Sequence, residues 1–415
     1  MESKIFTYIN TSTLPAADGP MADTRVAVES NISVENWPTD AQSMALENYV
    51  ALEDATLIAR LRDAGAYLKG RTAMGELGLG LDKDTGGDAV KSGLCDVVLK
   101  TDTTGEARIA ALRSGCFGFK PSYGLISRCG LIGLVPSMES CGILSNSLET
   151  ISTTARTMAG VDERDPSMDE AGIDKALSQF RQPEAFQDSP MTMGVILDWS
   201  TAMGQDMDQG ENKEFEQAVE KLDTAGVKSK TVDIKDFSLA GTVHNVIGTV
   251  EASSSAGRFD SVRYGHRTGT SVKNWNDMYI HSRGESFGPL VKAYLFQGGY
   301  FQYQNYSAFL DACRIRARLI ESVEKAFETV DMIVLPVSGR FGQTPENPNI
   351  VSEFYDAFSL TLLANLTGNP SICIPGSVNG DAGGRPALQL IGKRFDDAKL
   401  LALAGRVSDI HTGGM

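Results

Sequence analysis

Histidine and cysteine side chains often bind metal ions or act in catalysis, so their spacing is informative. No two of the four histidines stand at a metal-ligand spacing such as H-x-x-x-H, and the six cysteines include no C-x-x-C pair. We therefore expect no metal, no cofactor, and reduced, partly buried thiols in a cytoplasmic protein. These residues are His244, His266, His281, His411, Cys95, Cys116, Cys129, Cys141, Cys313 and Cys373.

Glycine-rich segments are the second place where chemistry could reside. The run that contains Gly78, Gly80, Gly86 and Gly87 is not a phosphate-binding loop, because it lacks G-K-[ST]. The 42 glycines fall in separate short groups, which indicates many tight backbone approaches rather than a linker. No nucleotide-binding motif is present.

The charge balance excludes some classes of partner. The 415 residues carry a net charge of −15, which disfavours a broad phosphate-binding face. A predicted helix carries Arg314, Arg316, Arg318 and Lys325, and a solvated helix face is the favoured interpretation of this group. We expect no direct nucleic-acid site. No apolar stretch reaches membrane-spanning length and no signal peptide is visible, so we expect no membrane association.

Hydrophobic patterning predicts alternating strands and helices, which indicates an α/β sheet covered on both faces. Asp54 is a plausible cap for the helix that starts near Leu52. The predicted elements used here are strands 24–28, 66–69, 231–234, 331–336, 372–375 and 387–391, and helices 52–65, 302–328 and 397–409.

Several segments resemble the amidase signature family. Thr101-Asp102-Thr103-Thr104-Gly105-Glu106-Ala107-Arg108 is similar to the family motif T-D-T-G-G-S-I-R, and residues 115–124 are similar to C-G-V-V-G-L-K-P-T-Y-G in the same register. Further segments resemble the branch formed by the A subunits of the glutamyl-tRNA(Gln) and aspartyl-tRNA(Asn) amidotransferases, in the family's order. These segments are residues 251–254, 258–265, 282–288, 365–370 and 388–393.

The resemblance implies a single amidase-signature domain over residues 1–415, with a large mixed, twisted sheet and helices on both faces. The family's N-terminal helices are almost absent. About twenty residues of the family pattern are missing just before Asp84, so the alignment there is uncertain.

The resemblance also locates the catalytic positions of the family, which uses a serine nucleophile, a bridging serine and a lysine. The nucleophile position falls on Glu106, the lysine position on Glu29, and the bridging position on Asp84 or Thr85. Thr101, Asp102, Thr103, Gly105 and Arg108 of the signature loop are retained. Three carboxylates in these places would repel one another and have no cationic partner, so we expect no serine-based amidase activity.

The substrate-binding positions have changed as well. The arginine that holds the glutamine carboxylate in the tRNA amidotransferase branch is replaced by Tyr294, and the aspartate that holds the amino group is replaced by Phe358. A neutral phenol and a phenyl ring cannot pair with a zwitterion.

Three hypotheses follow. The first is a catalytically inactive protein with the amidase fold that acts as a scaffold, regulatory or binding subunit. The second is a carboxylate cluster of Glu29, Asp84 and Glu106 that binds a cation or performs new acid/base chemistry; a solvated acidic loop is its simpler explanation. The third is a subunit that still works with other subunits of an amidotransferase-like complex.

Overall fold

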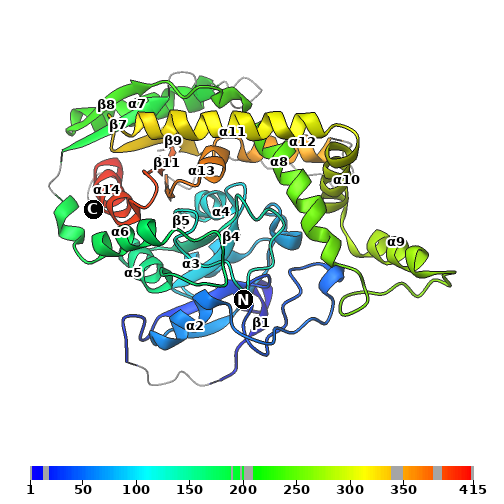
Figure 1. Cartoon of the computed structure of the whole chain (residues 1–415). Helices are drawn as coiled ribbons and strands as arrows, with labels where there is room; N and C mark the ends of the chain where they lie inside the picture. Colours follow the sequence, from blue (N-terminus) through cyan, green and yellow to red (C-terminus); the bar gives the residue numbers. More distant parts are fainter. Residues whose placement is uncertain are drawn as a thin grey trace.

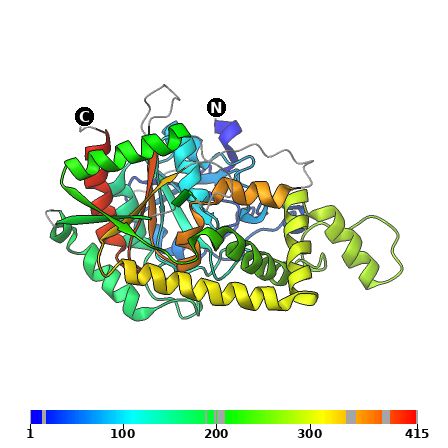
Figure 2. The ribbon, with the colours of Figure 1, turned by 90° about the horizontal axis from the view of Figure 1, so that it is seen from above.

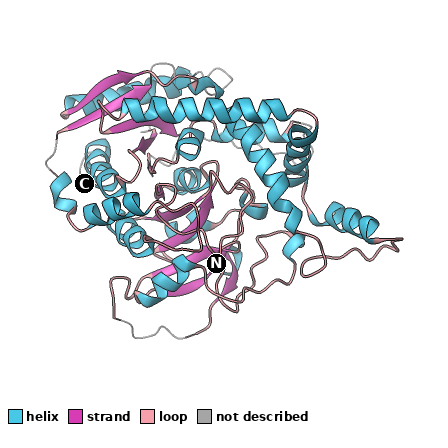
Figure 3. Ribbon diagram, in the orientation of Figure 1, coloured by secondary structure: helices cyan, strands magenta, loops and turns pink. Residues whose placement is uncertain are grey.

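The computed structural model describes residues 2–12, 18–187, 190–196, 199–200, 209–337, 349–376 and 386–412. These residues form one mixed sheet of eleven strands with helices on both of its faces (Figures 1 and 3). The predicted α/β class and mixed sheet are therefore confirmed. That residues 1–415 form a single domain stays a prediction.

The strands are β1 (Phe6–Ile9), β2 (Arg25–Glu29), β3 (Tyr67–Thr72), β4 (Val97–Asp102), β5 (Phe117–Lys120), β6 (Ser140–Ser145), β7 (Met191–Ile196), β8 (Val227–Val232), β9 (Met332–Val337), β10 (Ser371–Ile374) and β11 (Ala387–Ile391). Their order across the sheet is β1-β3-β2-β4-β6-β5-β10-β11-β9-β7-β8. Strand β2 is parallel to β3 and β4, and β7 is parallel to β8 and β9. The remaining pairs are antiparallel, so short turns and helical crossovers both occur.

The α-helices are α1 (Glu2–Ile5), α2 (Thr56–Asp63), α3 (Gly86–Lys91), α4 (Glu106–Ser114), α5 (Leu148–Met158), α6 (Glu170–Phe180), α7 (Gln209–Thr224), α8 (Ala240–Ser255), α9 (Trp275–Ser286), α10 (Pro289–Tyr303), α11 (Tyr306–Ala326), α12 (Ile350–Phe358), α13 (Leu362–Thr367) and α14 (Asp397–Thr412). Helix α4 packs against β4, β5 and β10. Helices α8, α10 and α11 pack on one another at one end of the molecule, where α9 projects from the body (Figures 1 and 2). None of the described helices is long and apolar enough to cross a membrane.

Two predicted helices have different limits in the structure. Helix α2 begins only at Thr56, and Asp54 does not cap it, because its carboxylate accepts the N–H of Glu35 and pairs with Arg62. The predicted long helix 302–328 is interrupted at residues 304–305, where α10 ends and α11 begins. Strand β8 lies earlier than the predicted strand 231–234, whereas strands β9, β10 and β11 confirm their predictions within a residue or two.

The predicted basic helix face is exposed except at Arg316. Arg314 pairs with Asp311, and Arg318 pairs with Asp236. Arg316 is partly buried and donates to the carbonyl of Leu366 and to Ser137. The predicted solvated face therefore describes Arg314, Arg318 and Lys325, whereas Arg316 contributes to the packing of the fold.

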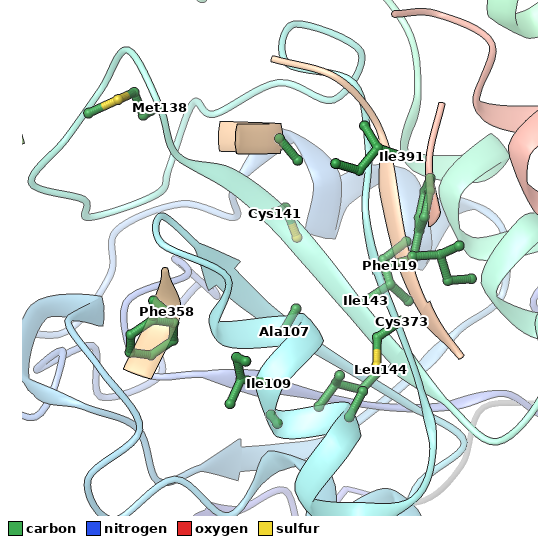
Figure 4. Packing of buried hydrophobic residues seen from close by; sticks show 14 of the residues in the cluster. Ala107, Ile109, Phe119, Met138, Cys141, Ile143, Leu144, Phe358, Cys373 and Ile391 are labelled. Atoms are coloured by element: carbon green, nitrogen blue, oxygen red, sulfur yellow. The ribbon is translucent and has the colours of Figure 1, made fainter. Parts of the chain in front are cut away.

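The signature segment lies at the end of a central strand. Every residue of β4 is buried, and α4 packs its alanine and isoleucine side chains into the hydrophobic core. Figure 4 shows Ala107 and Ile109 of α4 together with Phe358 among the buried hydrophobic side chains. The chemistry-bearing residues are thus held on rigid elements inside the molecule.

Candidate functional site

The signature loop is a sharp turn between β4 and α4. Gly105 has φ +130°, and a Cβ atom at this position would lie 2.2 Å from Oγ1 of Thr361. Only glycine fits both the backbone conformation and this contact. The turn leaves the N–H groups of Thr103, Thr104 and Gly105 pointing to one place, an arrangement that favours an anionic acceptor.

The acceptor in that place is the carboxylate of Glu106 itself. Its Oε2 accepts hydrogen bonds from the backbone N–H groups of Thr103 at 2.7 Å, Thr104 at 2.8 Å and Gly105 at 3.1 Å. Its Oε1 accepts a bond from the hydroxyl of Thr104 at 2.6 Å. The side chain is buried, with 2% of its surface exposed. Three backbone donors and one hydroxyl are therefore satisfied by a residue of the same loop.

Two opposing influences act on this carboxyl group. Burial raises the pKa of Glu106, and the nearby negative charge of Asp102 raises it further, whereas the hydrogen bonds from Thr104 lower it. The net pKa is above the ordinary glutamate value. The backbone donors nevertheless fix the orientation of the group toward its own loop.

Glu29 and Asp84 meet at a buried lysine that the sequence analysis did not consider. Lys100 Nζ lies 3.0 Å from Oε1 of Glu29, and it also forms an ion pair with Oδ2 of Asp84. Glu29 additionally accepts the backbone N–H of Thr101 at 3.0 Å, and Asp84 accepts the N–H of Gly86 at 2.7 Å. The expectation that these carboxylates lack a cationic partner was wrong, because Lys100 reaches between them from β4.

Burial controls the charges in this group. Desolvation raises the pKa of Glu29 to about 7, and Asp84 contributes in the same direction, while Lys100 opposes both. Desolvation alone would lower the pKa of Lys100, but the two carboxylates outweigh it and raise the pKa above the ordinary lysine value. Lys100 is 1% exposed, so the ammonium stays charged only because its carboxylate partners accompany it.

The three residues at the expected catalytic positions therefore have separate partners. Glu29 and Asp84 share Lys100, whereas the contacts of Glu106 are with its own loop. Thr85, the other candidate for the bridging position, accepts the N–H of Ala73 and donates to the carbonyl of Ile5. Within the described residues, no three His, Cys, Asp or Glu side chains are grouped to hold a metal ion.

The retained residues of the signature loop form its support. Arg108 and Asp102 make a fully buried ion pair at 2.8 Å. Burial alone would raise the pKa of Asp102, but Arg108 and Asn365 outweigh it and lower the pKa. Arg108 also donates to the carbonyl of Thr361, to Oε1 of Gln389 and to Asn365. Three segments with a family resemblance, distant in sequence, thus meet at one guanidinium group.

Packed aromatic side chains occupy the two expected substrate-binding positions. Tyr294 is fully buried on the inner face of α10, and Phe358 is 1% exposed at the end of α12. The tyrosine has room because α8 carries Gly248, where a Cβ atom would lie 2.4 Å from the Tyr294 hydroxyl. Neither side chain offers a charged group to a ligand.

A buried polar chain links Tyr294 to the signature loop. The hydroxyl oxygens of Tyr294 and Tyr355 are 2.7 Å apart, Tyr355 is 3.0 Å from Nδ1 of His244, and Nε2 of His244 is 2.9 Å from the carbonyl oxygen of Thr103. Burial lowers the pKa of His244 to about 4, so the ring is neutral at pH 7. Because a carbonyl only accepts, Nε2–H donates to Thr103, and Nδ1 accepts the proton of Tyr355.

Sequence reasoning missed Lys100, His244 and Tyr355. Lys100 had a visible signal, since a lysine that directly follows the apolar residues Val97-Val98-Leu99 in a buried strand requires a partner. His244 and Tyr355 had none, because they lie 111 residues apart and meet only through the packing of α8 and α12. Chemically, the site holds carboxylates that are already bonded, and it presents neither a serine nucleophile nor a free base next to one.

Comparison with known protein families gives a match over most of the chain. The family model described as Amidase matches residues 9–87 and 86–401. The A subunit of the glutamyl-tRNA(Gln) amidotransferase of Natronomonas pharaonis is 33% identical over 421 residues, covering 93% of this chain and 95% of that protein. The protein of the same name from Haloarcula marismortui is 31% identical, covering 95% and 97%.

Solved structures share the fold at lower sequence identity. The A subunit of the glutamyl-tRNA(Gln) amidotransferase of Thermotoga maritima superposes with a TM-score of 0.77 at 23% identity, covering 98% of this chain and 87% of that one. The 6-aminohexanoate cyclic dimer hydrolase superposes with a TM-score of 0.76 at 17% identity, covering 99% and 90%. These proteins therefore share the overall fold of this chain.

Proposed function

Because the chain belongs to the amidase family and is similar over most of its length to the A subunits of amidotransferases, we propose that it is a catalytically inactive member that acts as a scaffold, regulatory or binding subunit. The proposal combines a retained framework with substituted reactive positions. Arg108, Asp102 and Asn365 hold the loop as a rigid element. The positions that would act on an amide carry Glu29, Asp84 and Glu106 instead.

One observation carries the proposal. The family stabilises the oxyanion of its tetrahedral intermediate with backbone N–H groups of this loop. Here the N–H groups of Thr103, Thr104 and Gly105 are bonded to the carboxylate of Glu106. A substrate carbonyl would have to displace the buried carboxylate of Glu106, which its own short side chain joins to the same loop. The loop therefore lacks both a nucleophile and a free oxyanion hole.

The packing around the loop supports the same conclusion. Tyr294 and Phe358 fill the positions that would contact the glutamine zwitterion, and both are buried. Glu29 and Asp84 both pair with Lys100 and keep its amine protonated, so Lys100 cannot act as a base. The cation-binding alternative is less well supported, since the described residues place no three metal-ligating side chains together.

A restoration series tests the proposal. Ammonia release from glutamine and from simple amides would be measured for the wild type, for Glu106→Ser and for Glu106→Ala. We expect no turnover by the wild type or by Glu106→Ser, because the lysine and the bridging serine are also absent. Turnover by the wild type that Glu106→Ala abolishes would overturn the proposal.

A second candidate is a retained component of a tRNA-dependent amidotransferase. The similarity to curated A subunits, at 33% and 31% identity over nearly the whole chain, favours it. It predicts that the purified chain forms a stable complex with the other subunits of such an enzyme. Sedimentation of the mixture would show a heavier species, and unchanged sedimentation of each component would exclude this candidate.

A further inference from the structure

The end of the molecule formed by α9, α10 and α11 exposes an unusual number of apolar side chains. Of thirteen large hydrophobic side chains that are exposed among the described residues, seven lie between residues 275 and 310. They are Trp275, Ile280, Phe296, Tyr300, Tyr303, Tyr306 and Leu310. A concentration of this kind on a folded protein marks an interaction surface more often than it occurs by chance.

Helix geometry groups five of these residues on one face of α10 and one face of α11. Phe296, Tyr300 and Tyr303 are spaced four and three residues apart on α10, so they share one face. The opposite face of α10 is buried by Val291, Tyr294 and Gly298, and Gly298 lets α10 approach the carbonyl of Thr249 on α8. We call the residues Phe296, Tyr300, Tyr303, Tyr306 and Leu310 the aromatic face.

The composition of the aromatic face is that of an interface core rather than of an ordinary solvated surface. Between Pro289 and Leu310 the sequence carries seven Phe and Tyr residues, and Lys292 is its one charged residue. Protein interface cores are enriched in Tyr, Phe and Trp and depleted in charge. Phe296 and Tyr303 are 78% and 82% exposed, so a large part of each ring has no partner within the described chain.

The exposed area is sufficient for association. A large aromatic side chain offers about 150–250 Å², and the exposed fractions of Phe296 (78%), Tyr300 (53%), Tyr303 (82%) and Tyr306 (52%) give about 400–650 Å² together. Trp275 and Ile280 of α9 are exposed as well, and α9 projects from the body beyond α10 (Figure 2). The total approaches the roughly 800 Å² per partner of a standard interface.

We propose that the aromatic face binds the same face of a second copy of this chain around a twofold axis. An almost uncharged face can meet its own copy without opposing like charges. The adjoining segment 256–288, which includes α9, carries five of the 38 basic residues and three of the 53 acidic ones. It is thus net basic in a chain of net charge −15, and it complements the acidic body of a partner copy.

Light scattering coupled to size exclusion tests the proposal on the full chain at about 10 µM, because dimer formation depends on protomer concentration. The wild type is expected at twice the chain mass of 44.5 kDa. The variant Phe296→Glu, Tyr303→Glu is expected at the monomer mass, and the milder Tyr300→Ser is expected to weaken dimerisation about 30-fold. The control Leu52→Glu changes an exposed leucine away from the aromatic face and should remain dimeric.

Circular dichroism and melting temperatures of all variants establish whether each is folded. If the double variant does not fold, Tyr300→Ser still tests the proposal. A monomeric wild type would overturn the proposal, even if the same face then bound a different protein. A double variant that is folded and still dimeric would overturn it as well.

Discussion

Replacing Lys100 with methionine should destabilise the protein strongly, because the change leaves Glu29 and Asp84 buried beside each other without a cation. Lys100 is 1% exposed and its partners are almost as deeply buried, so solvent cannot replace the ammonium. Removal of one partner from a buried ion pair costs about 3–5 kcal/mol. Unfolding entropy of about 2.1 cal/mol/K per residue over this chain amounts to about 0.9 kcal/mol/K, so the melting temperature should fall by about 3–6 °C.

The dependence on pH identifies the cause. Lys100 lowers the pKa of Glu29, which burial and Asp84 raise, so this pKa rises above about 7 in Lys100→Met. Glu29 of the variant is then protonated at pH 5, which relieves the repulsion, and the loss of stability grows as the pH is raised to 8, by about 1.4 kcal/mol per unit of pKa change. Adding Glu29→Gln to Lys100→Met should recover about 2 kcal/mol at pH 8 and little at pH 5. Denaturant unfolding at the two pH values measures all of these free energies.

The surface pair Lys399–Asp331 provides the matched control. Its two side chains are each 27% exposed at a distance of 2.7 Å, so Lys399→Met should cost less than about 1 kcal/mol at either pH. If Lys100→Met were no more destabilising than this control, or were more harmful at pH 5 than at pH 8, the buried charge group described here would be refuted.

Three further predictions concern the same region. Glu106→Ala leaves the N–H groups of Thr103, Thr104 and Gly105 without an acceptor and should lower the free energy of unfolding by about 3 kcal/mol. Formate supplies the missing carboxylate, so formate, but not chloride at equal ionic strength, should raise the melting temperature of this variant and not that of the wild type. Arg108→Lys cannot reproduce the bonds of the guanidinium group and should cost about 3 kcal/mol or more in chemical denaturation, whereas a loss below about 1 kcal/mol would contradict its supporting role. The pKa of Glu29 is raised from 4.5 to about 7, so the stability that its protonated form contributes is present below pH 4.5 and is lost as pH rises through 7. The free energy of unfolding of the wild type should therefore fall by up to about 3 kcal/mol relative to that of Glu29→Gln over this interval. A difference between the two proteins that does not change with pH would contradict the raised pKa.

The sequence predicted the fold well because the framework segments kept their pattern. Strand β11 has the predicted limits, and the mixed sheet follows from segments whose order matches the family. The helix limits were less accurate where a side chain with two possible roles was involved. Asp54 has the type of a helix cap, yet it bonds to the N–H of Glu35, so helix α2 starts later.

The resemblance predicts which positions are substituted, but it does not predict which partners their side chains find. Glu106 comes from the signature motif, whereas Glu29 and Asp84 or Thr85 come from two other family segments, and these substitutions stay predictions. The pairing of Glu29 with Lys100 depends on two parallel neighbouring strands that bring position 27 beside position 98. The bonds of Glu106 to its own loop depend on the φ of Gly105. Such tertiary and conformational facts are not encoded in a local pattern.

The most direct test of the central claim is ammonia release from glutamine by the purified wild-type chain, compared with Glu106→Ala under the same conditions. We predict no release above the buffer for either protein, because the loop has no nucleophile and the backbone donors of the wild type are bonded to Glu106. Release by the wild type that disappears in Glu106→Ala would contradict the claim and would make Glu106 a catalytic residue.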